Sequence, residues 1–226
     1  MFLHRIHLNP RCGHARRDLA DAYQMHSTLC RAFSESNQKC PPCEFLWRLE
    51  PETDGDGFPR VLVQSRSIPD WERIADMEWF ARDPDPSIDL AQKLQLDTLQ
   101  IGQRFRFRLR ANPCIERQGR RQGLLRAEEQ ETWISRKGLN QCGFSLPEAG
   151  SWIVARPSSR RVSLQITQEQ MIRVKQRSGN DLTVFSVLYD GVLIVSDPSA
   201  FRQAFAAGIG HGKALGLGLL SLVPLT

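Results

Sequence analysis

The sequence predicts an α+β fold built from two similar modules. In residues 1–110 the hydrophobic pattern indicates a strand, a helix, two strands, a helix and a strand, in that order. Residues 111–226 repeat this pattern in a degenerate form. The order β-α-β-β-α-β is that of the ferredoxin-like fold, which RNA-recognition modules also use. We therefore expect two tandem ferredoxin-like domains, residues 1–110 and residues 111–226.

The first module is expected to begin with a strand at 2–8, where apolar residues alternate. A polar, arginine-bearing loop follows, and Asp18 or Asp21 can cap a helix that continues to about Ser34. The apolar residues of this helix recur at the spacing of a core-facing helix. The remaining predicted elements are strands at 44–49 and 61–66, a helix at 71–80 capped by Asp70, and a strand at 103–110.

The strand at 103–110 alternates arginines with apolar residues. Because successive side chains of a strand point to opposite faces, the arginines should share one face and the apolar residues should enter the core. Guanidinium groups at every second residue form a ladder that matches a phosphodiester backbone. The arginines of this predicted RNA-binding ladder are Arg104, Arg106, Arg108 and Arg110.

The second module is expected to combine two helices with a set of shorter strands. Residues 183–195 resemble a hairpin with Asp190-Gly191 at its turn. Pro198 can begin a helix that runs to about Ala207. The other predicted elements are a helix at 128–137 and strands at 151–156, 162–167 and 170–176.

The positive charge of the chain is concentrated in one region. The 226 residues carry a formal net charge of +5, which favours an anionic partner. Residues 104–137 hold ten Lys or Arg against four Glu, so the rest of the chain is slightly acidic. Such a footprint is typical of a nucleic-acid-binding surface, although solvated basic faces are also common. The further arginines predicted to bind RNA are Arg117, Arg120, Arg121, Arg156, Arg160 and Arg161.

The chain lacks the patterns of secreted and membrane proteins. Charged and polar residues interrupt any apolar segment at the N-terminus that could serve as a signal peptide. The apolar tail at 214–226 is too short to cross a bilayer. Six scattered cysteines do not form a disulfide framework. We therefore expect a cytoplasmic protein without a membrane partner.

A glycine-rich loop lies near the C-terminus, at 208–220. Its glycines allow backbone N–H groups to approach an anion, and Lys213 adds a positive charge. A Walker A motif would need Gly at 207 and Ser or Thr at 214, and both positions are Ala. A glycine-rich turn that leads into a closing strand remains the alternative. The residues of this loop predicted to support RNA are Gly208, Gly210, Gly212 and Lys213.

Tyr23 and His26 are the candidate catalytic residues. They lie three residues apart in the predicted first helix and are therefore neighbours on one face. Histidine transfers protons near neutral pH, and an adjacent tyrosine can position a phosphate. A structural His–Tyr pair is the alternative. Because no cluster of carboxylates suggests a two-metal nuclease, any cleavage should need neither a metal nor another cofactor.

Cys40 and Cys43 have the spacing of a zinc knuckle or a thiol–disulfide motif. No second CxxC and no pair of histidines completes a zinc site. The flanking sequence does not have the pattern of a thioredoxin fold. We expect a free pair of thiols in a surface turn.

Several blocks of sequence together resemble one family. The loop GIGHGKALGLGLL resembles the signature of the repeat-associated RNA-processing proteins of CRISPR systems, the RAMP superfamily. Other blocks are similar to the crRNA-processing endoribonucleases of type I-E systems, and together they span the chain. The segment at 36–44 does not match and is expected to be a variable loop. The matching blocks are LNP at 8–10, ARRDLADAYQMH at 15–26, LWRLEP at 46–51 and GQRFRFRLRANP at 102–113.

The resemblance implies a fold and a reaction. It implies two ferredoxin-like domains, and it places Tyr23 and His26 at the scissile phosphate. The implied activity is metal-independent cleavage of hairpin-containing CRISPR repeat RNA by its own 2′-hydroxyl, leaving a 2′,3′-cyclic phosphate and a 5′-hydroxyl. The implied partners are this stem-loop RNA and the other subunits of the Cascade complex. A non-catalytic hairpin-binding subunit of the same superfamily is the rival hypothesis.

Overall fold

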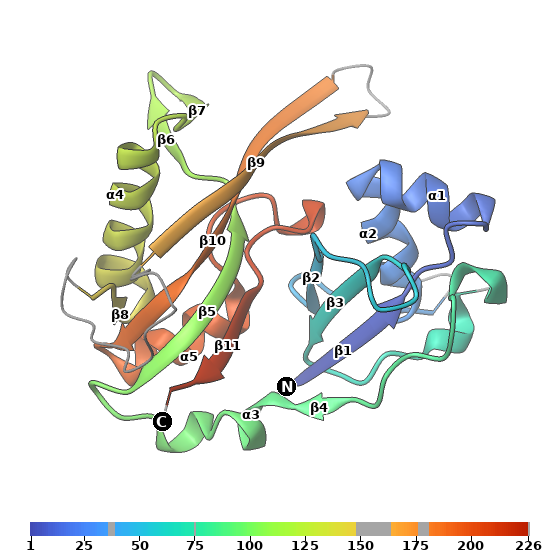
Figure 1. The fold of residues 1–226 in the computed structure, drawn as a ribbon, viewed down its shortest axis with the longest axis horizontal. Helices are drawn as coiled ribbons and strands as arrows, with labels where there is room; N and C mark the ends of the chain where they lie inside the picture. The colour runs from blue at the N-terminus through green and yellow to red at the C-terminus, as the bar shows by residue number, and fades with distance from the viewer. Residues whose placement is uncertain (36–38, 75, 148–163, 176–180, 226) are drawn as a thin grey trace.

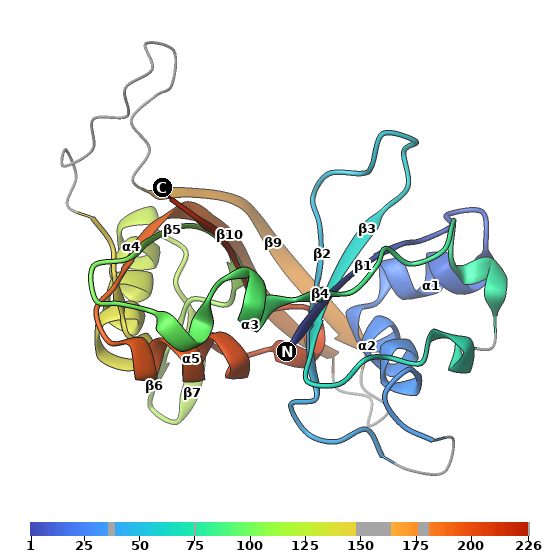
Figure 2. The same cartoon turned by 90° about the horizontal axis from the view of Figure 1, so that it is seen from below.

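The computed structural model describes residues 1–35, 39–74, 76–147, 164–175 and 181–225. The chain forms two lobes that lie side by side, each with its own β-sheet (Figure 1). The far ends of two long strands of the second lobe reach across to the helices of the first lobe (Figures 1 and 2).

The first lobe contains a four-stranded sheet in the order β2-β3-β1-β4, with antiparallel neighbours. Two helices, α1 (Gly13–Ala20) and α2 (Ala22–Arg31), pack on it. Their apolar residues Ala15, Met25 and Leu29 share one buried cluster with residues of the sheet. The strands are β1 (Phe2–His7), β2 (Phe45–Leu49), β3 (Arg60–Ser65) and β4 (Ile88–Asp89).

Helix α2 begins where Asp21 was expected to cap it. The Asp21 carboxylate accepts the backbone N–H of Tyr23 at 2.8 Å and that of Gln24 at 3.4 Å. The arginine-bearing segment before it is helix α1 and not the predicted loop. Few of its residues are apolar, so its sequence shows no helical period. It is held instead by the buried carboxylate of Asp18, which accepts the indole N–H of Trp79 at 3.0 Å.

The prediction of a helix at 71–80 is wrong. Two short 3₁₀ turns, η1 (Trp71–Arg73) and η2 (Met77–Trp79), occupy this segment. The Asp76 carboxylate accepts the N–H of Glu78 and so starts the second turn afresh. Asp70 makes no side-chain cap and binds the Arg73 guanidinium at 2.8 Å.

The second lobe repeats the sheet of the first. Its strands β9, β10, β5 and β11 lie in the same 2-3-1-4 order, again antiparallel, and β8 extends the other end of β10. The predicted α+β fold of two ferredoxin-like modules is confirmed. The elements are β5 (Arg104–Ala111), β8 (Phe144–Ser145), β9 (Leu164–Lys175), β10 (Asp181–Val195), β11 (Leu220–Pro224), α4 (Ala127–Lys137) and α5 (Pro198–Ala207).

Strand β5 belongs to the second sheet, whereas the sequence pattern assigned it to the first module. The two-residue strand β4 lies beside β1, in the position that the prediction gave to the strand at 103–110. The division at residue 110 stays a prediction, and a boundary before Arg104 would keep each sheet within one module.

The prediction of a hairpin at 183–195 is also wrong. Strand β10 runs unbroken through Asp190-Gly191, which lie opposite Arg108 and Phe107 of β5. Asp190 binds the Arg108 guanidinium of the neighbouring strand at 2.8 Å. This ion pair holds Asp190-Gly191 within the sheet, so the chain does not turn there. The two strands predicted at 162–167 and 170–176 are one strand, β9, with an irregular residue at Gln168. The strand predicted at 151–156 lies outside the described residues.

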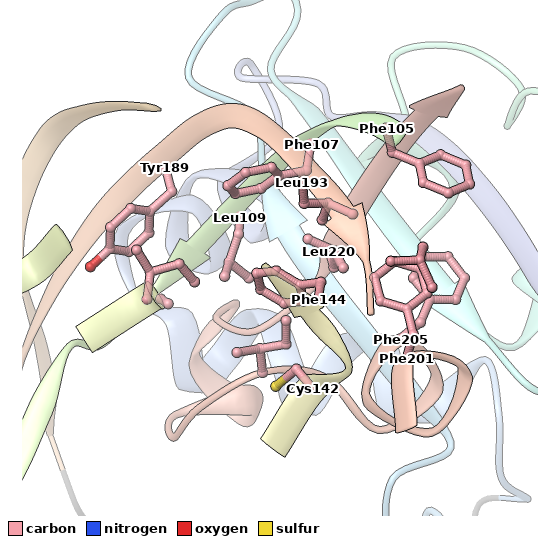
Figure 3. Close-up of a cluster of buried hydrophobic side chains, with 14 of the residues drawn as sticks. Phe105, Phe107, Leu109, Cys142, Phe144, Tyr189, Leu193, Phe201, Phe205 and Leu220 are labelled. Carbon is pink, nitrogen blue, oxygen red and sulfur yellow. The ribbon is translucent and has the colours of Figure 1, made fainter. Parts of the chain in front are cut away.

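The core of the second lobe forms around the apolar face of β5. Phe105, Phe107 and Leu109 are buried, as the alternation predicted. Phe201 and Phe205 of α5 pack against the same cluster (Figure 3). None of the helices that the structure describes has the length and apolar character needed to cross a membrane. The remaining elements are α3 (Leu90–Lys93), η3 (Leu96–Thr98), β6 (Cys114–Arg117), β7 (Arg120–Gly123), the π-helix η4 (Gly138–Cys142) and η5 (Lys213–Leu215).

Candidate functional site

Helix α2 carries both candidate catalytic residues. Tyr23 lies in its first turn and its side chain is 48% exposed. His26 lies one turn further and is partly buried, with its ring centroid 5.1 Å from that of Phe45. Within the described residues no hydrogen bond joins the two side chains. The helix therefore presents a solvent-exposed phenol beside a half-buried imidazole.

The surroundings of His26 favour a neutral imidazole. Burial lowers the pKa of His26 below its ordinary value, because the charged form loses hydration. Its Nε2 atom lies 3.6 Å from the Cys30 thiol. Its Nδ1 atom is buried and has no hydrogen-bond partner in the part of the chain that is described. A neutral ring of this kind can accept a proton and, once charged, return it.

The glycine-rich loop packs directly against the first lobe. Each of its five glycines has a positive φ, between 77° and 92°. A Cβ atom at Gly216 would lie 3.0 Å from the Trp47 ring, and one at Gly208 would lie 2.9 Å from Leu46. The glycines therefore allow the loop to approach β2 closely. The loop leads directly into strand β11. The structure therefore contains the glycine-rich turn before a closing strand that the sequence offered as the alternative to a phosphate-binding loop.

The tip of this loop gathers positive charge from three elements. Burial lowers the pKa of His211, and the nearby charges of Arg121, Lys137 and Lys213 lower it further. These cations come from β7, the end of α4 and the loop itself. Such a cluster favours an anion. Arg121 and Lys213 were predicted from the sequence, whereas His211 and Lys137 were not, because only the fold brings them to the loop.

A basic hairpin projects from the second lobe (Figure 1). Strands β6 and β7 pair with each other in a sheet of their own, and Arg117 lies opposite Arg120. The turn residues Gln118 and Gly119 have φ of 51° and 70°, as a tight two-residue hairpin turn requires. The arginines at 117, 120 and 121 are all exposed. The sequence predicted basic residues here but no hairpin, because Gln-Gly is a weaker turn signal than Asn-Gly.

The arginine ladder of β5 is only partly open. Arg104 and Arg106 are exposed. Arg108 binds Asp190 at 2.8 Å, Glu52 at 3.1 Å and Glu50 at 3.2 Å, and the hydrogen bond to Asp190 is the main reason that its pKa is raised.

Arg110 is buried and donates to the Gln168 side chain at 2.6 Å. Strand alternation does not reveal the carboxylates and amides that face β5, and RNA binding by the four arginines stays a prediction.

A cavity of about 580 Å³ lies between the two lobes beside α2. Neither Tyr23 nor His26 lines it, because these residues occupy the neighbouring faces of the helix. Its lining includes Asp18, Met25, Trp47, Arg110, Gln170 and Leu215.

The remaining candidate residues are of two kinds. Arg156, Arg160 and Arg161 lie outside the described residues. Cys40 and Cys43 are unbonded; Cys43 is exposed, as expected for a surface turn, whereas Cys40 is partly buried against the hydrophobic cluster of the first lobe. Among the described residues no group of three or more His, Cys, Asp or Glu is arranged to hold a metal ion.

Comparison with known proteins defines the class of this chain. The profile of the family described as CRISPR associated protein matches residues 1–224. The CRISPR-associated endoribonuclease Cse3 of Thermus thermophilus is 37% identical in an alignment of 233 positions that covers 99% of this chain and 100% of that protein. The CRISPR system Cascade subunit CasE of Escherichia coli (strain K12) is 29% identical, over 93% of this chain and 96% of that protein. The chain therefore belongs to this family of CRISPR-associated proteins.

Solved structures support the same assignment. Cse3 bound to a 19-nucleotide RNA superposes with a TM-score of 0.78 at 37% identity, over 99% of this chain and 100% of that one. Thermus thermophilus Cse3 bound to an RNA representing a pre-cleavage complex gives 0.76 at 36% identity, over 99% and 98%. The sequence blocks resembled one group within the RAMP superfamily, the CasE (Cse3) proteins. These comparisons confirm that resemblance.

Proposed function

We propose that this chain is an endoribonuclease that cuts hairpin-containing CRISPR repeat precursor RNA. The observation that carries the proposal is its full-length similarity to Cse3, a protein named as a CRISPR-associated endoribonuclease. The presence of His26 on an accessible helix beside an exposed tyrosine supports catalysis over the rival hypothesis of a purely RNA-binding subunit.

The proposed reaction uses the RNA as its own nucleophile. The 2′-hydroxyl loses its proton, its oxygen bonds to the adjacent phosphorus, and the bond from phosphorus to the 5′-oxygen breaks. The departing oxygen takes up a proton, which leaves a 2′,3′-cyclic phosphate and a 5′-hydroxyl. These steps require in-line positioning and proton transfer, and no metal ion enters the scheme. His26 transfers a proton as base or acid, and Tyr23 positions the phosphate.

The proposed RNA contacts come mainly from the second lobe. The hairpin arginines Arg117, Arg120 and Arg121 face solvent, where phosphates can reach them. Because A-form RNA has a deep and narrow major groove, we assign these contacts to backbone and shape. Arg104 and Arg106 extend the basic surface along β5, whereas Arg108 is assigned to joining the lobes and Arg110 to the contact with β9.

The glycine-rich loop completes the proposed RNA surface. Lys213 belongs to the cation cluster around His211, which supports an anion-binding role for the loop. Gly208, Gly210 and Gly212 give its backbone the conformation that brings this cluster together. Arg156, Arg160 and Arg161 stay proposed contacts on their charge alone.

The product RNA is proposed to stay bound, so that the chain becomes a subunit of a Cascade complex. The similarity to the E. coli Cascade subunit CasE supports this assignment. The six cysteines of this chain form no disulfide, which fits the proposed location in the reducing cytoplasm.

The decisive experiment removes the nucleophile. The purified chain is mixed in EDTA with a repeat RNA and with the same RNA carrying one deoxyribose just upstream of the cut. We expect the normal RNA to be cut, with a cyclic phosphate on the 5′ fragment, and the deoxy RNA to bind but stay whole. Efficient cutting of the deoxy RNA would rule out attack by the 2′-hydroxyl.

A further inference from the structure

The cavity between the two lobes has no part in the proposed reaction, yet its lining has the make-up of a binding site. Its volume of about 580 Å³ falls in the range of pockets that hold small organic groups. Apolar side chains from both lobes form one part of the lining. They are Met25, Trp47 and Leu49 of the first lobe and Ile172 and Leu215 of the second.

The polar part of the lining is organised around Arg110, which is buried. Its guanidinium donates to the amide oxygen of Gln168 at 2.6 Å and to that of Gln170 at 3.4 Å. Because arginine has only donors, it holds the two amide oxygens, and the two amide nitrogens point elsewhere. Within the described residues these nitrogens donate no hydrogen bond, and both glutamine side chains are exposed. Two N–H donor groups are therefore available to a ligand in the cavity.

The backbone of β9 is irregular at this place. Gln168 has a φ of 50°, and Gln168 and Glu169 together lie opposite the single residue Val187 of β10. Bulges of this kind often re-aim a side chain beside a functional site. Here the bulge lets Arg110 bind the backbone carbonyl of Gln168, at 3.3 Å, as well as its amide oxygen. The strained residue is thus part of the device that directs the amide donors.

The charge of the lining does not suit a phosphate. Among the described residues that line the cavity, three are charged: Asp18, Glu50 and Arg110. Asp18 already binds Arg17 at 2.8 Å, and Glu50 binds Arg48 at 2.6 Å. Two carboxylates against one arginine disfavour an anion. The lining instead suits a neutral group that has apolar faces and hydrogen-bond acceptors at its edge.

The cavity adjoins the candidate catalytic residues along helix α2. Ala22 and Met25 line it, and each is followed directly by a candidate catalytic residue, Tyr23 and His26. A nucleotide whose phosphate lies at Tyr23 and His26 can therefore extend its base around the helix into the cavity. Proteins that recognise RNA by sequence commonly bind unpaired bases splayed out in this way.

We propose that this cavity binds one unpaired base of the repeat RNA beside the scissile phosphate, and that Gln168 and Gln170 select uracil or guanine there. The inference rests on the proposed function and adds a specificity site to it. A glutamine with both its oxygen and its nitrogen free typically binds adenine. Because Arg110 holds the oxygens, only donors remain, and these favour the keto oxygen of uracil or guanine.

The test uses the full chain and repeat RNAs in which each unpaired nucleotide flanking the cut is made abasic in turn. Affinity and single-turnover cleavage are measured for each RNA. We expect one position at which loss of the base weakens binding by about tenfold or more. At that position adenine should bind more weakly than uracil or guanine. The proposal is overturned if every abasic RNA binds as well as the intact RNA, or if adenine is preferred.

A substitution that fills the cavity locates the effect on the protein. Gln170→Trp changes an exposed position of β9, where a strand accepts tryptophan readily. This variant should bind intact RNA about tenfold more weakly than the parent and lose nothing further with the abasic RNA, because both changes remove the same contact. The matched control Gln165→Trp changes an exposed glutamine of the same strand that does not line the cavity, and it should behave as the parent. Independent, additive losses in Gln170→Trp would place the base elsewhere.

A smaller substitution tests the selection of the base. Gln170→Ala removes one donor and leaves the apolar lining in place, so it should reduce the preference for uracil or guanine over adenine. An unchanged preference would contradict the role given to the amide donors.

The failure of this inference differs from a failure of the proposed function. If the parent cuts the intact RNA and no abasic position matters, only the base-binding site is wrong. If the parent does not cut repeat RNA at all, the proposed function is wrong.

Discussion

At the scale of single residues, burial tunes His26. Its partly buried ring lies against Phe45 and meets the Cys30 thiol. Burial lowers the pKa of His26, so the charged ring with a proton on both nitrogens is disfavoured. Near neutral pH the side chain is therefore mostly neutral and responds to protonation at lower pH than an exposed histidine. This property gives the proposed mechanism a measurable pH signature.

Replacing His26 with alanine should slow single-turnover cleavage by about 10²- to 10⁴-fold, because a proton-transfer group is lost. The parent should show a titration in its pH–rate profile below pH 6.5, the ordinary value for histidine, because burial lowers the pKa of His26. A rate that rises with pH through this titration identifies the neutral ring as base, and a falling rate identifies the charged ring as acid. RNA affinity of His26→Ala should equal that of the parent. A titration at or above pH 6.5 would contradict the assignment.

At the scale of elements, the β6–β7 hairpin concentrates exposed arginines on a short, separate ribbon. Replacing both Arg120 and Arg121 with alanine should weaken the binding of hairpin RNA. It should also reduce the steepness of the plot of log affinity against log salt by about 2, because two fewer phosphates are neutralised and their counterions are no longer released on binding. The measurement is affinity at several salt concentrations.

The matched control replaces Arg66 and Arg73, which are exposed on the first lobe and carry the same charge. Its salt slope should stay close to that of the parent. If the slope of the Arg120/Arg121 variant were unchanged, Arg156, Arg160 and Arg161 would become the leading RNA contacts.

The sequence predicted the elements whose evidence is local. The alternating strands of the first sheet, the Asp21 cap and the helices near 128–137 and 198–207 all show hydrophobic period or cap residues. Helix α1 and strand β4 could not be predicted, because tertiary contacts and not apolar period hold them. The Asp190-Gly191 turn failed for the same reason, since Arg108 holds Asp190 within the sheet.

The candidate site was predictable to a similar extent. The helical spacing of Tyr23 and His26 placed both on α2, and the count of charges located the basic region but not the hairpin that carries it. The cation cluster around His211 and the contacts of Arg110 with β9 depend on how the second lobe folds, and the ion pairs of Arg108 with Glu50 depend on how the lobes meet. No local pattern carries that information.

At the scale of the whole molecule, one buried arginine joins the lobes. Arg48 of β2 binds Glu50 at 2.6 Å and donates to the backbone carbonyls of Arg108 and Leu219 in the second lobe. It also donates to the Ser221 hydroxyl at 2.9 Å. Arg108 reaches back to the same Glu50, so both lobes contribute to one charge network. This network fixes β2, and with it the first lobe that carries α2, relative to the second lobe.

Replacing Arg48 with alanine should lower the free energy of unfolding by about 3–5 kcal/mol, because buried polar partners lose their donor. Urea unfolding measures this change. The control Arg5→Ala breaks a surface pair with Asp85 and should cost about 1 kcal/mol or less. Equal losses in the two variants would show that the buried network does not hold the lobes together.

The separateness of the β6–β7 hairpin has a consequence for engineering. Its strands pair only with each other among the described strands, and a backbone hydrogen bond from Leu124 to Pro113 at 2.8 Å closes its base. The turn and the exposed arginines of such a ribbon can be exchanged if its base is kept, because Ile115 and Leu124 pack into the core of the second lobe. Exchanging these arginines should change the strength and salt dependence of RNA binding, while the proposed catalytic residues on α2 stay those of the parent.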